Sequence, residues 1–207
     1  VPSKGNYNVK LIENPYEKWR DIDSSLPDHK TEILVAPTTS GTRDAWNSLI
    51  MKKGCKAAGA YKLWEDAGEK AKKKCAVVRE DGRVIEAGEN DTLIVQKLAE
   101  DPERFGYFGY SYLLANEDKI KSAAITGILP TLAGIQDYSY PIARPLQFYV
   151  KKAHIGVVPG IEEFLAAFTS ENAMGEDGYL TDIGLVALSD GDASDIRTRV
   201  ANLEVIQ

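Results

Sequence analysis

The sequence predicts an α/β fold. Segments with helical periodicity alternate with short apolar runs along most of the chain, which is the pattern of helices packed on a sheet. The clearest example is the predicted strand at residues 31–36 with its apolar run Ile33-Leu34-Val35, which is followed by a polar loop and by a helical segment from residue 44. With 207 residues, 43% of them hydrophobic, the chain is long enough for one large domain or two small lobes.

Helices are expected where apolar side chains recur every three or four residues. Asn90 or Asp91 is the expected N-cap of one helix, Gly54 is the expected stop of another, and Ser194 is the expected start of the last. In chain order, the predicted helices are a turn at 15–19 and the segments 44–52, 61–74, 91–100, 161–168 and the one from 194.

Strands are expected where short apolar or aromatic runs lie between turn residues. Residues 75–78 and 83–86 predict a hairpin around Asp81-Gly82. The other predicted strands are 31–36, 105–112, 123–126, 146–150 and a short one within 178–188. The stretch 138–145 contains two prolines and shows neither period, so it is the predicted boundary between two lobes.

The charge pattern excludes some partners. The chain carries 25 Lys and Arg against 31 Asp and Glu, and it has no basic domain, so a nucleic-acid partner is not expected. The densest basic run, residues 70–74, is expected to be a solvated helix face, with a contact patch as the alternative. No apolar run approaches the ~20 residues of a membrane span, so membrane insertion is not expected. The chain opens without Met or a signal-peptide pattern, and we expect that its start was processed, cut or left out.

The polar loop after the first predicted strand has the composition of an anion site. A helix start leaves about four backbone N–H groups unpaired and carries a partial positive charge. The hydroxyls of Thr39, Ser40 and Thr42 add donors, Gly41 lets a ligand approach the backbone, and Arg43 adds a guanidinium. The loop is not a P-loop, because no lysine follows the glycine. These residues suit a small oxyanion, and plain helix capping explains them as well.

Residues for catalysis or metal binding are not apparent. His29 and His154 have no Cys or carboxylate at metal-ligand spacing and accompany no nucleophile elbow. We therefore expect no metal, no cofactor and no enzymatic activity. Cys55 and Cys75 are compatible with one disulfide or with two reduced, buried thiols.

The polar loop resembles the second phosphate loop of the periplasmic phosphate-binding proteins that serve ABC importers. The resemblance is carried by Thr39-Ser40-Gly41-Thr42-Arg43-Asp44-Ala45-Trp46 and extends, in the family's order, from about residue 15 to residue 188. The further matches are Trp19-Arg20-Asp21-Ile22-Asp23, Ser25-Leu26-Pro27, Gly88-Glu89-Asn90-Asp91, Phe105-Gly106-Tyr107-Phe108-Gly109-Tyr110 and Tyr140-Pro141-Ile142-Ala143-Arg144-Pro145-Leu146.

This resemblance implies a two-lobed periplasmic-binding-protein fold. Residues 1–141 would form most of lobe two, and residues 142–207 would form the hinge crossing and the C-terminal part of lobe one. Thr39, Ser40, Gly41, Thr42 and Arg43 would hold inorganic phosphate without a metal. The resemblance further implies an exported, periplasmic protein that delivers phosphate to the membrane subunits of an ABC importer. Export favours a disulfide between the two cysteines.

The chain departs from the family pattern in two ways. Some members carry an arginine shortly before the serine, whereas residues 35–38 contain none, and Arg43 matches the alternative placement. Family chains are also longer, and their N-terminal part holds another phosphate loop with an acidic group that rejects sulfate. We therefore expect a separate or missing N-terminal segment that completes lobe one. The alternatives are a protein of the same fold for sulfate, molybdate or a phosphonate, a phosphate-ester hydrolase, and a structural or adhesive protein that has lost its ligand.

Overall fold

The computed structural model describes residues 11–88 and 90–205, which form two compact units. Of the described residues, unit 1 comprises 11–88, 90–112 and 116–120, and unit 2 comprises 113–115 and 121–205. Residues 1–4, with which the chain opens, lie outside the described residues. So does Glu89, which belongs to the segment just before the predicted 91–100 helix. The lobe division at residues 141 and 142 stays a prediction.

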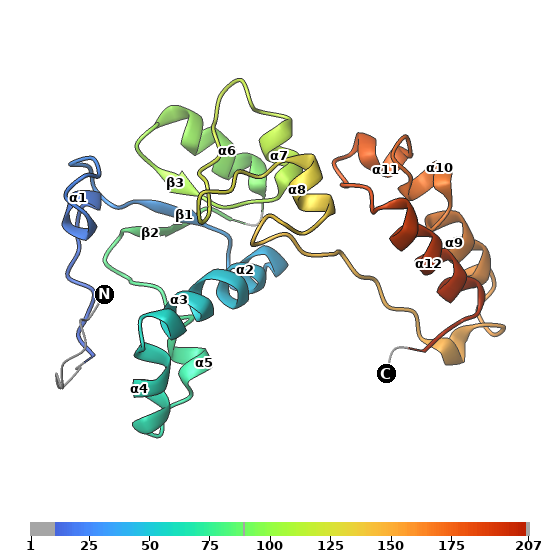
Figure 1. Ribbon diagram of the computed structural model, residues 1–207, viewed down its shortest axis with the longest axis horizontal. Helices are drawn as coiled ribbons and strands as arrows, with labels where there is room; N and C mark the ends of the chain where they lie inside the picture. Colours follow the sequence, from blue (N-terminus) through green and yellow to red (C-terminus); the bar gives the residue numbers. More distant parts are fainter. Residues whose placement is uncertain (1–10, 89, 206–207) are drawn as a thin grey trace. The chain divides into compact units, whose positions relative to one another are not determined.

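Unit 1 is built on a parallel sheet of three short strands (Figure 1). The strands are β1 (Ile33–Val35), β2 (Val84–Glu86) and β3 (Phe105–Gly106), in the order β2-β1-β3. Leu34 of the central strand lies opposite Ile85 on one side and Gly106 on the other. The strand predicted at 31–36 is confirmed, and its unbroken apolar run suits the centre of a parallel sheet, where both faces are covered.

One face of the sheet is covered by helix α6 (Asp91–Glu100), which lies across the sheet from α2 in Figure 1. The core of unit 1 consists of Leu34, Ala87 and Ile94, with Ile85, Leu98 and Phe108 packed against it. A Cβ atom at Gly106 would lie 3.0 Å from Cγ2 of Ile94 and 3.2 Å from Cδ1 of Leu98. Glycine at this position therefore allows α6 to pack closely on β3. The helix begins as predicted, since the Asn90 side chain accepts a hydrogen bond from Thr92 N–H at 2.9 Å.

The helix after β1 starts earlier and runs further than predicted. It consists of α2 (Gly41–Trp46), a π-helical stretch (Asn47–Met51) and α3 (Lys52–Ala57). The predicted start at Asp44 is wrong because Ser40 is the N-cap, and its Oγ accepts a hydrogen bond from Thr42 N–H at 3.1 Å. The predicted stop at Gly54 is also wrong. The helix ends at Ala57, and Gly59 just beyond it has a φ of 77°, the left-handed conformation that terminates a helix.

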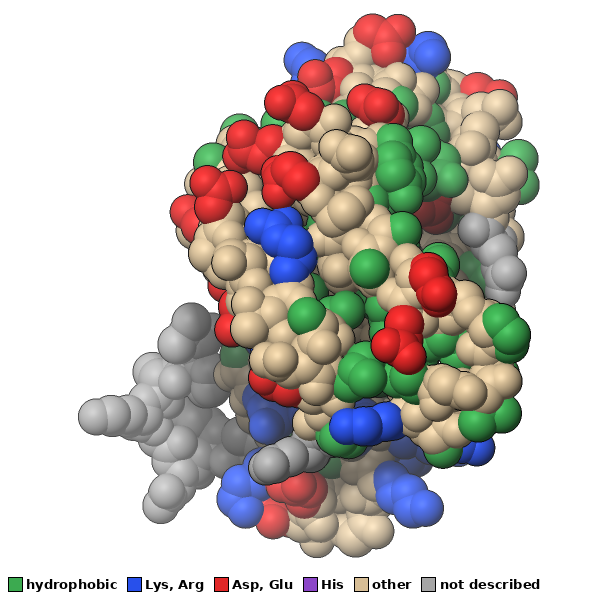
Figure 2. All heavy atoms as spheres, turned by 90° about the vertical axis from the view of Figure 1, so that its right-hand side faces the viewer, with side chains coloured by type: hydrophobic (Ala, Val, Ile, Leu, Met, Phe, Trp, Pro, Cys, Tyr) green, Lys and Arg blue, Asp and Glu red, His purple; other side chains and the backbone are tan. Residues whose placement is uncertain are grey.

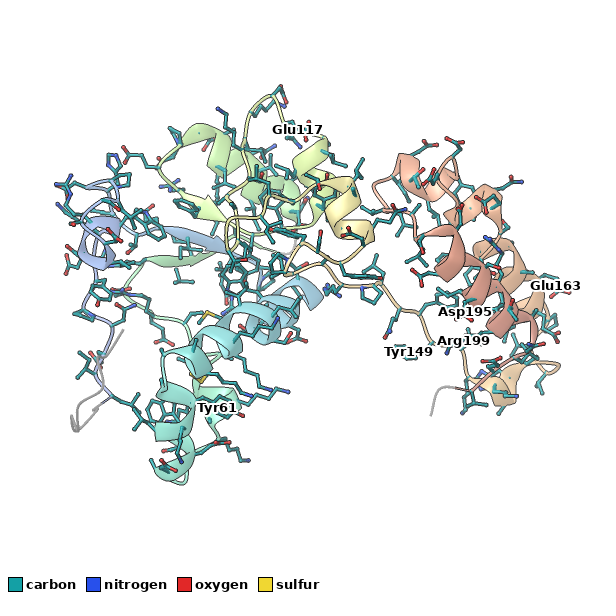
Figure 3. The ribbon with its side chains drawn as sticks, in the orientation of Figure 1. Tyr61, Glu117, Tyr149, Glu163, Asp195 and Arg199 are labelled. Atoms are coloured by element: carbon teal, nitrogen blue, oxygen red, sulfur yellow. A yellow bond between two sulfur atoms is a disulfide. The ribbon has the colours of Figure 1, made fainter. Side chains whose placement is uncertain are left out.

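A disulfide joins Cys55 in α3 to Cys75 at the end of α5, and it is drawn in yellow in Figure 3. Between them lie α4 (Ala60–Asp66) and α5 (Ala71–Lys74), so the single helix predicted at 61–74 is wrong. The helix is interrupted between Asp66 and Ala71, where Gly68 adopts a left-handed conformation with a φ of 75°. The predicted disulfide is confirmed, with 5.9 Å between the two Cα atoms.

Replacing both cysteines with serine is expected to lower the free energy of unfolding by about 3 kcal/mol, because the bridge restricts a loop of this length in the unfolded chain. Urea unfolding of the oxidised protein and of the double variant measures the difference. A second double variant with alanines controls for the polarity of the introduced hydroxyls. Equal unfolding free energies for all three proteins would contradict the prediction.

The predicted hairpin at 75–86 is wrong. Cys75 caps α5 and is tied to Cys55, so the preceding helix extends to the residue where the first hairpin strand was expected. Val84–Glu86 instead pairs in parallel with β1, and Ile33 N–H donates to Arg83 O at 2.9 Å. The segments on either side of Asp81-Gly82 therefore do not pair with each other as strands.

Four other predicted strands are wrong in whole or in part. In 105–112 only Phe105–Gly106 is a strand, because Asp91 Oδ2 accepts from Gly109 N–H and the chain turns into α7 (Tyr110–Leu114). Residues 123–126 lead into a tight turn, with positive φ at Thr126. Residues 146–150 pair with no strand among the described residues, and Tyr149 is 73% exposed. The segment 178–188 holds helix α11 (Tyr179–Asp182).

Unit 2 is helical over the described residues. Besides α11 it contains α8 (Leu132–Gln136), a 3-10 turn (Lys152–His154), α9 (Ile161–Phe168), α10 (Glu171–Met174) and α12 (Asp190–Ala201). The helix at 161–168 is confirmed. The last helix begins before the predicted Ser194, because Ser189 is its N-cap and accepts from Asp192 N–H at 3.2 Å. In unit 1, the helical turn predicted at 15–19 is wrong in position: the turn is α1 (Trp19–Ile22), because the Asp21 carboxylate accepts from the N–H of Glu17 and Lys18 just before it.

Candidate anion-binding site

The polar loop lies at the carboxyl edge of the unit 1 sheet. The chain leaves the central strand β1, returns as β2 on one side, and then crosses to β3 on the other side. The chain therefore moves from one side of β1 to the other, and a topological switch point lies between the carboxyl ends of β1 and β3. The carboxyl edge at such a point is the usual ligand site of open α/β sheets. The loop from Ala36 to Ser40 follows β1 at this edge, and the segment after Gly106 follows β3.

The start of α2 offers backbone donors at this edge. Ser40 N–H donates to Pro37 O, and Thr42 N–H donates to the Ser40 hydroxyl. Among the described residues, no hydrogen bond is recorded for Gly41 N–H or Arg43 N–H. A Cβ atom at Gly41 would meet nothing within 4 Å, so the backbone there is open to an approaching ligand. The helix continues through the π-helical stretch to Ala57, so its dipole adds partial positive charge to these donors.

Arg43 is buried beneath the loop, with 3% of its surface exposed. Its Nη1 donates to the carbonyl oxygen of Ala36 at 2.8 Å and lies 3.9 Å from Glu86 Oε1. Its Nε has no hydrogen-bond partner among the described residues. The guanidinium thus holds the end of β1 against the first turn of the helix, which is a role that the sequence did not predict.

A stacked aromatic pair closes the buried side of this region. The rings of Trp46 and Tyr107 lie 4.3 Å apart and are almost parallel, with 3° between their planes. Burial raises the pKa of Tyr107, and the positive charge of Arg43 lowers it by a smaller amount. The Tyr107 hydroxyl is buried and, like Oδ1 of Asn47 one helical turn after Arg43, has no hydrogen-bond partner among the described residues. Both oxygen atoms have the capacity to accept a hydrogen bond from a water or a ligand.

All five predicted site residues lie in the same loop, but they differ in how far they are exposed to solvent. Thr39 and Gly41 are exposed, Ser40 and Thr42 are half-buried, and Arg43 is buried. In the sequence, Trp46 and Tyr107 are marked only as members of the matched motifs, and no motif includes Asn47. Its signal is its position four residues after Arg43, on the same face of the helix.

The carboxylates near the loop do not make a metal site. Glu86 is half exposed and belongs to the Arg43 ion pair, and Asp91 accepts the hydrogen bond from Gly109. The described residues contain no group of three or more His, Cys, Asp or Glu side chains placed to hold a metal ion. The arrangement at the loop is one of hydrogen-bond donors, which suits an anion.

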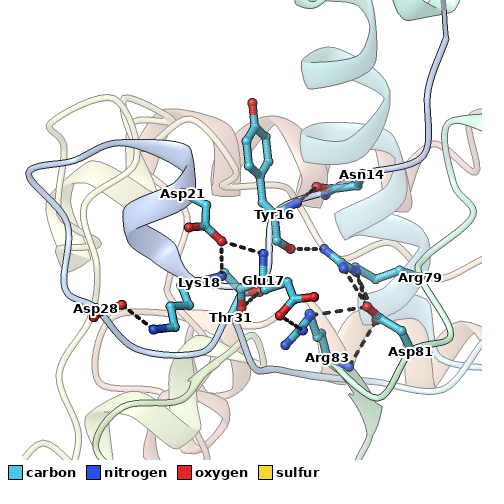
Figure 4. Close-up of polar contacts among 10 residues, drawn as sticks. All are labelled: Asn14, Tyr16, Glu17, Lys18, Asp21, Asp28, Thr31, Arg79, Asp81 and Arg83. Carbon is cyan, nitrogen blue, oxygen red and sulfur yellow. Dashed lines mark hydrogen bonds and ion pairs between the residues drawn. The ribbon is translucent and has the colours of Figure 1, made fainter.

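A second cluster of arginines lies near the amino ends of β1 and β2, where it is structural (Figure 4). Arg79 donates from Nη1 to Tyr16 O at 2.6 Å and pairs with Asp81 through Nη2 at 2.6 Å. Arg83 pairs with Glu17 at 3.2 Å and with Asp81 at 3.3 Å. Because both guanidiniums are engaged by carboxylates, this cluster ties the segment before α1 to β2 and is not a free anion site.

The pKa of Asp81 is lowered chiefly by its hydrogen bonds from Arg79. Replacing Arg79 with glutamine is expected to raise that pKa toward its ordinary value. A lowered carboxyl pKa contributes stability above the pKa of the unfolded chain, and this contribution is lost as the pH falls through the folded value. NMR titration of the Asp81 carboxyl carbon measures the shift. Asp23, whose pKa is lowered by Ser25 without a cation, is the control and should not change. An unchanged Asp81 in the variant would rule out Arg79 as the cause.

Comparison with known proteins points to one family. The PBP superfamily domain matches residues 7–172. The phosphate-binding protein PstS of Staphylococcus haemolyticus is 28% identical over 168 residues, which are 79% of this chain and 44% of that protein. PstS of Staphylococcus aureus strain MRSA252 is 28% identical over 169 residues, 78% of this chain and 43% of that protein. The chain therefore spans less than half the length of these relatives.

Two crystal structures share the fold. One is a possible phosphate-binding protein from Planctomyces limnophilus, with a TM-score of 0.60 and 25% identity, and the match covers 92% of this chain and 60% of that one. The other is PstS from Borrelia burgdorferi, with a TM-score of 0.54 and 20% identity over 84% of this chain and 58% of that one. No helix of the described residues has the length and hydrophobicity needed to cross a membrane.

Proposed function

Because this chain belongs to the PBP superfamily, we propose that it binds inorganic phosphate and delivers it to an ABC-type importer as an exported, non-catalytic binding protein. The observation that carries the proposal is the open first turn of α2 at the switch point of the sheet. Gly41 N–H and Arg43 N–H face no partner among the described residues, and a Cβ atom at Gly41 would meet no residue beyond its chain neighbours within 4 Å. The printed names of the relatives, phosphate-binding proteins, support phosphate as the anion.

The donors proposed for phosphate are Thr39, Ser40, Gly41 and Thr42, with Arg43 behind them. Backbone N–H groups and hydroxyls hold an oxyanion by hydrogen bonds and need no positive field from the whole protein. This agrees with a chain whose net charge is −6. Arg43 contributes by placing the carbonyl of Ala36 and by adding its charge from below the loop.

The proposed site is one half of a phosphate cradle. The relatives are more than twice as long as the matched region, and we propose that the part beyond it completes lobe one and supplies the groups that distinguish phosphate from sulfate. Unit 2 supports this, because Phe148 and Phe164 pack around Phe168 yet stay 42% and 56% exposed. Figure 2 shows hydrophobic side chains at the surface of this unit. Intact-mass analysis of the protein isolated from its own cells tests this. A single species of 22.7 kDa without a second fragment would contradict a two-fragment protein.

Isothermal calorimetry with phosphate and with sulfate tests the ligand. Phosphate binding without a response to sulfate is expected in the protein that contains the completing segment. Binding of sulfate, molybdate or a phosphonate in preference to phosphate would overturn the choice of anion while leaving the site in place.

Two glycines of one helix provide a matched test of the site itself. Alanine at Gly41 or at Gly54 meets no atom within 4 Å, so either substitution should preserve the fold and raise helix stability by up to about 1 kcal/mol. We expect Gly41→Ala alone to weaken phosphate binding, by roughly tenfold, because a methyl group obstructs the approach to the N–H groups. Calorimetry of the two variants measures this. Equal affinities would remove the start of α2 from the site.

A further inference from the structure

The segment 52–74 has a charge opposite to that of the rest of the protein. It contains eight lysines, no arginine and three carboxylates, a formal charge of +5, so the other 184 residues together carry −11. We call this segment the lysine arm. It comprises α3, α4 and α5, and the predicted phosphate loop is not part of it.

The lysine arm is a fixed and exposed structure. The disulfide from Cys55 to Cys75 closes it, and Ala71 is its one fully buried residue. Figure 1 shows α4 and α5 directed away from the sheet of unit 1. An exposed segment held by a covalent bridge presents its charges in a constant arrangement, which a flexible charged loop does not do.

Most of the positive charge of the arm is uncompensated. Lys62 pairs with Asp66 and Lys74 with Glu69, whereas four exposed lysines make no side-chain ion pair or hydrogen bond to another described residue. These four are Lys53, Lys70, Lys72 and Lys73. Like charges gathered on one segment repel one another, so they favour a surface of opposite charge.

Two aromatic rings lie among the lysines. The ammonium group of Lys56 is 5.0 Å from the centre of the Tyr61 ring, and that of Lys74 is 5.0 Å from the centre of the Trp64 ring. Tyr61 is labelled on α4 in Figure 3. Tyrosine and tryptophan are favoured at the headgroup level of membranes, because their rings are apolar and carry one polar atom.

We infer that the lysine arm is a docking surface for a bilayer that contains anionic phospholipids. Lysine is a hydrated point charge that suits a diffuse negative surface, whereas arginine is preferred for paired contacts with single carboxylates or phosphates. The use of lysine alone, together with Tyr61 and Trp64, therefore favours a lipid surface over an acidic protein or a nucleic acid. The arm has no extended apolar face, so we expect it to lie on the headgroups without insertion. This inference does not depend on phosphate binding.

Vesicle flotation tests the inference. The full chain is mixed with vesicles of phosphatidylcholine alone, or with equal parts of phosphatidylcholine and phosphatidylglycerol. A test variant changes the four unpaired lysines of the arm to glutamine. A control variant changes four exposed lysines outside the arm to glutamine, namely Lys30, Lys119, Lys121 and Lys151. Both variants therefore have the same net charge.

The inference requires binding to the anionic vesicles that is lost at high salt, retained in the control variant and reduced in the test variant. The reduction should be about 100-fold or more, since each lysine near an anionic surface contributes roughly a fivefold factor. Equal losses in the two variants would show that net charge, and not the arm, causes binding. If the full chain binds neither kind of vesicle, the membrane assignment is overturned. Binding to polyglutamate or to DNA without binding to vesicles would also overturn it.

Discussion

Replacement of Arg43 by alanine is expected to lower phosphate affinity by about 10- to 150-fold, which corresponds to the ~1.5–3 kcal/mol of a hydrogen bond to a charged group. The physical reason is twofold. The variant loses a positive charge under the proposed site, and it releases the carbonyl of Ala36 that Nη1 holds at 2.8 Å. Calorimetry with phosphate measures the loss in the protein that contains the completing segment.

Arg104 supplies the control for this prediction. It belongs to the same unit and pairs with Glu32 at 2.8 Å, but this pair precedes β3 and β1 and therefore lies at the amino edge of the sheet. Arg104→Ala removes a half-buried arginine without touching the loop, and we expect it to keep the phosphate affinity. If Arg43→Ala remains folded by near-ultraviolet circular dichroism and still binds like the parent, Arg43 has no part in the site.

Ile94→Ala is expected to lower the free energy of unfolding of unit 1 by about 2–5 kcal/mol. Ile94 is fully buried between α6 and the sheet, and its truncation leaves a cavity against Leu34 and the Cα of Gly106. Urea unfolding followed by tryptophan fluorescence measures the loss, because Trp19, Trp46 and Trp64 all lie in unit 1.

Leu93 is the matched control for Ile94, as the adjacent residue of the same helix with 44% of its surface exposed. Leu93→Ala should cost less than about 1 kcal/mol, since little apolar surface is exposed by its removal. Similar losses in the two variants would show that α6 does not pack on the sheet with the face that the structure assigns to it.

Two helices and the central strand could be predicted from local patterns. The 161–168 helix and the 91–100 helix have an apolar face at helical spacing, and the second also has an Asn90 cap. The run Ile33–Val35 is apolar throughout, as expected for a strand covered on both faces. These features depend on residues that are close in the sequence, so a local pattern is enough to predict them.

Strand pairing could not be predicted in the same way. The segments on either side of Asp81-Gly82 have the composition of a hairpin, but Val84–Glu86 pairs with a strand about fifty residues earlier. Residues 105–112 are apolar and aromatic enough for a long strand, yet the hydrogen bond from Gly109 N–H to Asp91 ends the ladder. In both cases a partner distant in the sequence decides the outcome.

The sequence by itself indicated the family, the α/β class and the polar loop from Thr39 to Arg43, because each of these is expressed in consecutive residues or in an ordered set of motifs. It left the state of Cys55 and Cys75 open, and only the resemblance to an exported family favoured the disulfide that the structure contains. Only the tertiary structure decided how the loop is built. It placed Arg43 beneath the loop on the Ala36 carbonyl and stacked Tyr107 on Trp46. It also left Gly41 N–H, at the carboxyl edge of the sheet, without a hydrogen-bond partner among the described residues. The reason is that the order β2-β1-β3 brings together residues some seventy positions apart, and no local pattern records which strands become neighbours.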